Sequence, residues 1–205
     1  MLVAASEVLM NAVADYAAAK ALLTRPLPAY VSYHVRSHVK FDAIISDETS
    51  EITVRTSDGV VVKGKVPSAP RAEVHVGNER DQGMEPVRHA AFKPACYEAK
   101  SARMQSYQGR QLEALQLQDL CSKDPGDKDF DTLYIDPRSL EPVVASGSDD
   151  SDHVDVQLLQ NFTRVEDHVL PSTLYVRVKG SGLMFWLDLL VDERYDRYRF
   201  SNVAP

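Results

Sequence analysis

Long apolar runs, basic clusters and cysteines are all scarce in this chain. No apolar segment approaches the roughly 20 residues that a membrane-spanning helix needs, so the sequence contains no candidate transmembrane segment. The formal charge of -7, without a clustered basic face, argues against general binding to nucleic acid or to anionic lipid surfaces. A nucleophile elbow, a phosphate-binding loop and a metal-ligand motif are also missing. The sequence therefore gives no support to an enzymatic function.

The chain has only two cysteines, Cys96 and Cys121. In an oxidising compartment they would be able to form one disulfide, whereas in the cytosol they would be two unrelated small apolar side chains. The sequence leaves both alternatives open. Two thiols so far apart, without a nearby histidine motif, are a poor zinc site.

Length and composition indicate a globular protein. The chain has 205 residues, of which 44% are hydrophobic and 26% are charged, close to the average for folded domains. No linker or internal repeat divides it, so we expect a single domain over residues 1–205.

One helix is predicted, from Ser6 to Leu23. Ser6 is a plausible N-cap, and Pro26 and Pro28 end the helix. Apolar residues recur at spacings of three and four along it, which places them on one stripe that would cover a face of a sheet. The stripe consists of Leu9, Ala12, Val13, Tyr16, Ala19 and Leu23.

The next part of the chain is predicted to form strands. From Ala29 to Phe41, apolar and polar residues alternate, as in a strand with one buried face. Segments Ile44–Thr56 and Val60–Val66 form a hairpin through Ser57-Asp58-Gly59. Residues 71–76 are expected to form a further short strand, and residues 77–95 a long loop.

Further alternating runs continue to the end of the chain. Segment 97–109 fits either a polar helix or an irregular strand, and 111–120 is predicted to be a strand. Lys179-Gly180-Ser181-Gly182 is the predicted turn of one of the hairpins that follow, because glycine allows the positive φ of a tight turn. The C-terminal runs are Thr132–Asp136, His153–Phe162, Ser172–Lys179, Leu183–Val191 and Arg194–Phe200. A sheet of ten or eleven antiparallel strands must curl.

Histidine and aspartate patterns give little reason to expect a metal. His34 and His38 are four residues apart in a predicted strand, about 13 Å at the usual rise. The acidic segment with Asp149, Asp150 and Asp152 lacks the ligand spacing of a calcium loop, so it is interpreted as a solvated hairpin loop. Residues 192–199 alternate acids with arginines and are interpreted as a solvated strand face with local ion pairs.

The order of these elements resembles the LolA-like superfamily of periplasmic lipoprotein carriers, which includes the lipid-sensing domain of RseB-type regulators. The resemblance is most specific in three places. They are the strand Leu133-Tyr134-Ile135-Asp136 before the turn 137–142, the segment Leu170-Pro171-Ser172 before a hairpin, and the final run Tyr195-Asp196-Arg197-Tyr198-Arg199-Phe200. The chain departs from the carriers in its 77–95 segment and its acidic 149–152 segment.

The resemblance implies an α+β, mainly β fold. It is a single curled antiparallel sheet, a half-barrel of about eleven strands, with an N-terminal helix and a helical or loop lid. Its concave face would accept a lipid or the acyl chain of a lipoprotein, without cofactor or metal and without enzymatic activity. We expect a monomer in the periplasm or cell envelope, exported with a signal peptide that is then removed, with an envelope protein as a further partner.

The residues expected to line this face alternate along the predicted strands, and Tyr16 would contribute from the helix. They are Tyr33, Val35, Phe41, Ile52, Val54, Leu133, Ile135, Leu174, Val176, Phe185 and Leu187. For each residue, the alternative is an ordinary core position. The corresponding alternative function is an interaction module whose interior is filled by its own side chains and whose 77–95 loop contacts a partner. An enzyme with histidines and aspartates at the barrel mouth is a third, weaker hypothesis.

Overall fold

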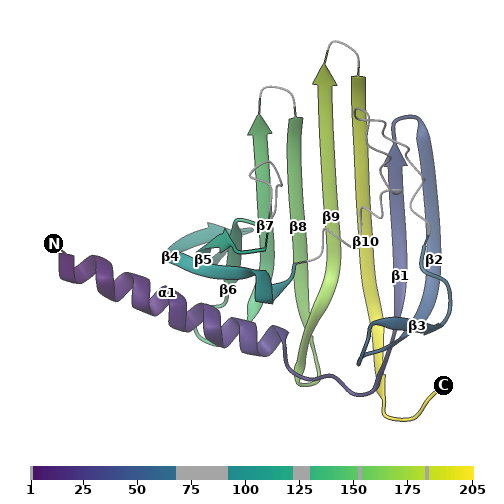
Figure 1. Cartoon of the computed structure of the whole chain (residues 1–205), viewed down its shortest axis with the longest axis horizontal. Coiled ribbons are helices and arrows are strands. Elements are labelled where there is room, and N and C mark those ends of the chain that lie inside the picture. Colours follow the sequence, from purple (N-terminus) through teal and green to yellow (C-terminus); the bar gives the residue numbers. More distant parts are fainter. Residues whose placement is uncertain (1, 68–91, 122–129, 152–153, 183–184) are drawn as a thin grey trace.

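In the described part of the chain, ten strands form one antiparallel sheet in the order β3-β2-β1-β10-β9-β8-β7-β6-β5-β4 (Figure 1). The computed structural model describes residues 2–67, 92–121, 130–151, 154–182 and 185–205, and of residues 2–9, 149–151, 154, 181–182 and 185–187 it describes the backbone alone. The elements are α1 (Leu2–Leu23), β1 (Tyr30–Phe41), β2 (Ile44–Arg55), β3 (Val60–Lys63), the 3-10 turn η1 (Pro94–Cys96), β4 (Tyr97–Tyr107), β5 (Arg110–Asp119), β6 (Thr132–Ile135), β7 (Pro142–Ser151), β8 (Val154–Val165), β9 (His168–Gly182) and β10 (Phe185–Ser201).

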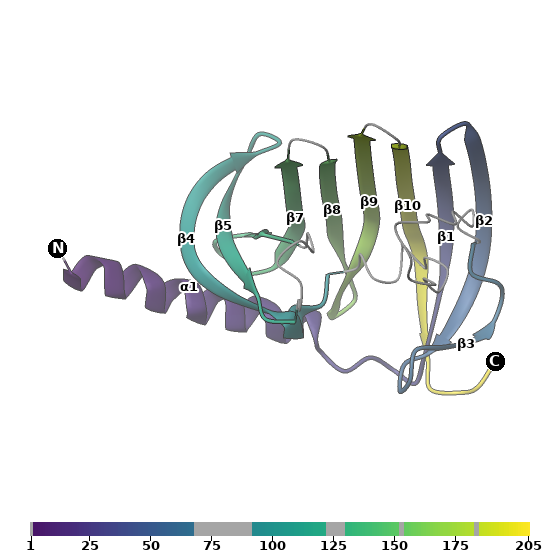
Figure 2. The same ribbon diagram turned by 45° about the horizontal axis from the view of Figure 1, so that its top comes forward.

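The sheet curls without closing. Strands β4 and β5 arch away from the plane of β7–β10, as Figure 2 shows, and β3 and β4 remain at the two ends of the strand order. The half-barrel expected from the sequence is thus confirmed. The predicted strand 71–76 and most of the predicted 77–95 loop lie outside the described residues.

The chain runs as a meander from β4 to β10, and β1 then pairs with β10, antiparallel. The N-terminal strands follow the predicted alternation, and the turn at Gly59 has the expected positive φ of 70°. Segment 97–107, for which the sequence left two alternatives, is a strand. A turn with positive φ at Gln108 and Gly109 joins it to β5.

Three predictions about the C-terminal strands are wrong. Strand β7 was not predicted, because its small residues do not alternate in polarity, and Asp149 and Asp150 belong to it rather than to a loop. Gly180 lies within β9, paired with Leu187, so it is not in the predicted turn. The runs 183–191 and 194–200 form one strand, β10, which is bent by an irregularity opposite Tyr33 where Arg197 has a φ of 57°.

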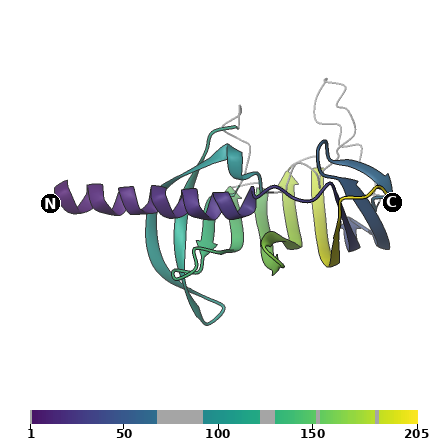
Figure 3. The same cartoon turned by 90° about the horizontal axis from the view of Figure 1, so that it is seen from below.

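The helix covers one side of the sheet. It has its main contacts with β4 and lesser ones with β9 and β7. Its N-terminal end projects beyond the sheet (Figure 3). The helix begins at Leu2, so Ser6 lies inside it and is not the predicted N-cap. It ends before Pro26 as predicted, and the Thr24 hydroxyl donates a hydrogen bond to the Lys20 carbonyl at 2.8 Å.

The predicted helical stripe is correct in part. Ala12, Tyr16 and Ala19 are buried in the main hydrophobic core, and Leu23 packs against it. Val13, in contrast, is 51% exposed. The side chain of Leu9 lies outside the described part of the structure.

Candidate functional site: the inner face of the sheet

We define the inner face as the side of the sheet that packs against Tyr16 of α1. Its core runs from Leu115 on β5 through β6, β7, β8 and β9 to Val191 on β10 and Val39 on β1. Directly paired residues of neighbouring strands share a face, which makes this a continuous apolar surface. A smaller cluster around Leu112 and Tyr134 lies on the opposite, outer face.

Five of the predicted lining residues come together in this inner-face core. Four come from the sheet and the fifth, Tyr16, comes from the helix, while Phe41 packs against the cluster. The sheet residues are Leu133, Ile135, Leu174 and Val176. The Tyr16 hydroxyl donates a hydrogen bond to the Pro94 carbonyl at 2.8 Å, which ties the helix to η1. Burial raises the pKa of Tyr16, so this donor stays protonated.

The predicted residues of β1 and β2 lie along the same face. Val35 and Ile52 are buried. Tyr33 pairs with Ile52, and Val54 pairs with Val31. Phe185 and Leu187 are backbone positions of β10 paired with glycines of β9, and their side chains lie outside the described part of the chain.

Sequence reasoning missed the polar part of the inner face. Glu193 pairs with Ser37 of β1 on one side and with Leu174 of β9 on the other, so its carboxyl points to the inner face. It is only 6% exposed. The prediction that Glu193 belongs to a solvated acidic strand face is therefore wrong.

Two hydroxyl groups contact the Glu193 carboxyl. Ser37 Oγ donates a hydrogen bond to Oε1 at 3.2 Å, and the Tyr195 hydroxyl donates one to Oε2. Burial raises the pKa of Glu193, although the hydrogen bonds from Tyr195 and Ser37 oppose the rise. Within the described residues, no basic side chain forms an ion pair with Glu193.

Three tyrosines gather beside this carboxyl, and we call Tyr33, Tyr195 and Tyr198 the tyrosine cluster. The Tyr33 ring lies 6.0 Å from that of Tyr195, edge to face, and 5.3 Å from that of Tyr198. The Tyr198 hydroxyl donates a hydrogen bond to the Pro171 carbonyl at 2.6 Å. The irregularity in β10 brings both of its tyrosines against Tyr33, because it shifts the strand by one residue between them.

The outer face of the same strands carries paired charges. Arg36 contacts Asp196 at 2.7 Å, and Lys40 contacts Asp188 at 2.7 Å. Arg199 contacts Glu51 at 2.9 Å. The predicted solvated face with local ion pairs is thus confirmed here, and only Glu193 departs from it.

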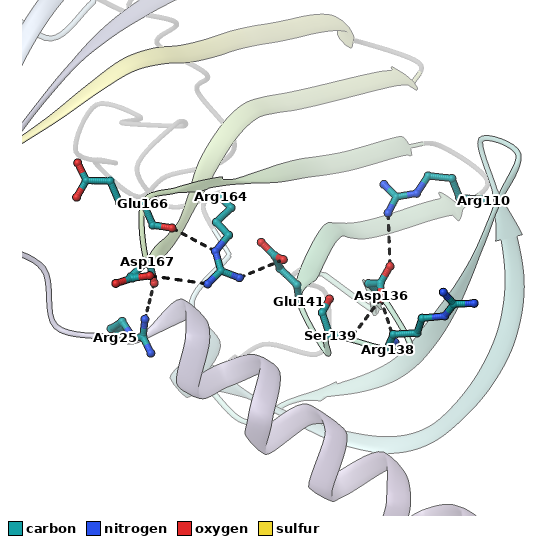
Figure 4. A network of polar contacts seen from close by, with 9 residues as sticks. All are labelled: Arg25, Arg110, Asp136, Arg138, Ser139, Glu141, Arg164, Glu166 and Asp167. Atoms are coloured by element: carbon teal, nitrogen blue, oxygen red, sulfur yellow. Dashed lines mark hydrogen bonds and ion pairs between the residues drawn. The ribbon is translucent and has the colours of Figure 1, made fainter.

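Polar contacts also hold the end of the helix to the sheet (Figure 4). Arg25, just after the helix, donates a hydrogen bond to the Asp167 carbonyl at 2.7 Å in the β8–β9 turn. Arg164 lies 3.6 Å from Glu141 and donates to the carbonyl of Glu166. This network links the helix end, the segment before β7 and the β8–β9 turn.

Asp136, in one of the segments that carry the family resemblance, has a structural role. Its carboxylate accepts hydrogen bonds from the backbone N–H groups of Arg138 at 2.9 Å and Ser139 at 3.1 Å (Figure 4). These two hydrogen bonds lower the pKa of Asp136, and Arg110, at 3.7 Å, adds a smaller effect. The carboxylate therefore shapes the turn between β6 and β7 and takes no part in the inner face.

The two cysteines form a disulfide, with their Cα atoms 5.1 Å apart. It joins η1, which also contains the Pro94 carbonyl that accepts the Tyr16 hydrogen bond, to the residues just after β5. No group of three or more potential metal ligands was found among the described residues. The described helix does not combine the length and the apolar character needed to cross a membrane.

No protein-family model matches the sequence, and no curated protein is significantly similar to it. Two solved structures align with this chain over most of its length. A DUF1329 family protein from Desulfovibrio piger aligns over 94% of this chain and 93% of its own, with a TM-score of 0.51 and 10% identity. A LolA superfamily protein from Nitrosomonas europaea aligns over 96% and 95%, with a TM-score of 0.47 and 7% identity. At such identity, the similarity to the Desulfovibrio protein concerns the fold alone.

Proposed function

We propose that the chain is a non-enzymatic cell-envelope protein that binds a hydrophobic ligand, a lipid or the acyl chain of a lipoprotein, on its inner face. The observation that carries the proposal is the extent of this face. The apolar core runs across β4 to β10 and into β1, while the helix has its main contacts with β4 alone. The unclosed sheet extends beyond the helix, and we propose that an acyl chain takes the place of the cover that now buries Val176 and Val191 there.

The binding free energy would come mainly from burial of the ligand's hydrocarbon chain. Each methylene that moves from water onto an apolar surface contributes about 0.8 kcal/mol. Affinity should therefore rise with acyl-chain length until the chain extends beyond the inner face. The disulfide supports an oxidising location such as the periplasm, since such bonds form and persist there. We extend the proposal to a single domain over residues 1–205 that acts as a monomer.

Solvent extraction of the purified protein, followed by mass spectrometry, tests this function. We expect a co-purifying lipid, which should be absent from a parallel preparation of Val176→Trp, a variant that fills the inner face. Uptake of Nile red, an uncharged fluorescent probe, provides the second measurement. Competition by octanol, dodecanol and hexadecanol should strengthen with chain length. A protein without lipid that also fails to bind Nile red would refute the proposal.

The second candidate function is an interaction module with a self-filled interior. The observation that favours it is the complete burial of central inner-face side chains, since Leu115, Leu133 and Ile135 are each 0% exposed. In that case, the 77–95 segment would contact a protein partner. A wild-type protein that takes up no probe, together with a Val176→Trp variant that loses stability, would favour this alternative.

A further inference from the structure

The inner face is not uniformly apolar, because a row of acidic and hydroxyl side chains crosses it beside the tyrosine cluster. Across β2, β1 and β10, the residues Glu48, Ser37 and Glu193 are paired in one row and therefore share the inner face. Glu193 is more than nine-tenths buried and carries a carboxyl group, while the tyrosine cluster lies directly beside it. A carboxylate next to several aromatic rings is the arrangement that recognises ammonium groups, through charge and cation–π attraction.

Among the described residues, the hydrogen bonds to Glu193 leave some of its acceptor positions unused. An ionised carboxylate has about four acceptor positions, and the hydroxyls of Ser37 and Tyr195 occupy one on each oxygen. Neither hydroxyl carries a charge, so their hydrogen bonds offset only part of the cost of burying the carboxylate. Elsewhere on the same strands, acids are paired with bases, as in the contact of Lys40 with Asp188 at 2.7 Å.

Building on the proposed function, we propose that Glu193 and the tyrosine cluster bind the ammonium group of an amphiphile whose hydrocarbon chain lies along the inner face. Ser37 and Glu193 would accept hydrogen bonds from the ammonium N–H groups, while Tyr33 would present its ring to the cation. A free fatty acid would be a poor ligand in comparison, since its carboxylate would meet Glu193 with a charge of the same sign.

Displacement of Nile red by three amphiphiles with the same twelve-carbon chain tests the inference. The competitors are dodecylammonium, dodecanol and dodecanoate, each used below its micelle concentration. For the wild type we expect dodecylammonium to compete at least about tenfold more strongly than the other two. The Glu193→Gln variant should lose this preference when the strength of each competitor is expressed relative to the variant's own affinity for Nile red.

A charge-matched control distinguishes an effect of the Glu193 carboxyl from an effect of the protein's net negative charge. Glu51→Gln removes the same charge on the outer face, where Glu51 is exposed and pairs with Arg199 at 2.9 Å. It should retain the full preference for dodecylammonium. If Glu193→Gln does not fold, Tyr33→Leu decides, because loss of its ring should reduce the same preference severalfold.

The outcomes separate this inference from the function on which it rests. If the wild type does not bind Nile red, the proposed function fails and the inference fails with it. If Nile red binds but the three amphiphiles compete equally, only the inference is refuted. A preference for dodecylammonium that persists in Glu193→Gln, or in Tyr33→Leu where that variant decides, also refutes it.

Discussion

Replacing Tyr16 by Asp tests whether the helix is anchored in the inner-face core. The Tyr16 side chain is only 5% exposed and lies in the main hydrophobic cluster. A buried charge without a partner costs about 3–5 kcal/mol. For a protein of this size, each kcal/mol shifts the melting temperature by about 2–4 °C, so we expect a decrease of roughly 6–20 °C.

Two further variants make this test specific. Tyr16→Phe keeps the ring but removes the hydrogen bond to the Pro94 carbonyl, which should cost about 1 kcal/mol. Val13→Asp places the same charge on the exposed side of the helix, where Val13 is 51% exposed, and should leave the melting temperature nearly unchanged. The measurement is thermal unfolding by circular dichroism. Equal melting temperatures for Tyr16→Asp and Val13→Asp would refute the packing of the helix on the sheet.

Three other variants test the inner face and the disulfide. Val176→Trp should abolish Nile red uptake with little loss of stability if the inner face accepts a ligand, whereas in a packed core it should cost about 1–3 kcal/mol. Glu193→Gln should raise the melting temperature at pH 8. The reason is that the wild type loses stability as the pH rises from about 4 through the raised pKa of Glu193, where the buried carboxyl ionises. A difference in melting temperature between variant and wild type that persists at pH 4 would contradict this. Cys121→Ser should cost about 3 kcal/mol, since the disulfide closes a loop with a sequence separation of 25; recovery of both thiols free from an oxidising compartment would contradict the disulfide itself.

The strands that the sequence predicts best are those with one face in water. In β1, the apolar residues Val31, Val35 and Val39 are buried, and Arg36 and Lys40 form ion pairs on the outer face. The alternation of apolar and polar residues along the strand reflects these two environments. The same logic correctly placed Leu174 and Val176 on β9.

Where both faces of a strand are covered, or its side chains are small, the pattern is lost. Strand β7 contains Ala145 and Gly147, which are both buried, and its sequence shows no period of two. The glycines of β9 also misled the prediction, because glycine in a strand permits close backbone approach as well as turns. The strand-pairing partner of a glycine shows whether it lies in a strand or in a turn, and a single sequence does not reveal strand pairing.

Glu193 shows how the site itself was missed. Its charged neighbours on β10, Asp192 and Arg194, suggested a solvated face, yet it continues the alternation of Leu189 and Val191 on the inner face. Extending the two-residue alternation of Leu189 and Val191 to the next position would have predicted that the Glu193 carboxyl is buried on the inner face. The contacts of Tyr33 with Tyr195 and Tyr198 were beyond sequence reasoning, because they depend on the irregularity in β10.

The pairing of β1 with β10 has a consequence for biosynthesis. One edge of β1 finds its partner only when residues 189–201 have been synthesised, near the end of the chain. Until then, the β1–β2 hairpin presents an open edge, and the middle of the sheet cannot assemble. We therefore expect the half-barrel to remain incomplete until β10 has been synthesised. With this strand order, β1 and β2 stay separate from β4 to β9 until β10 has been synthesised and pairs with both β1 and β9.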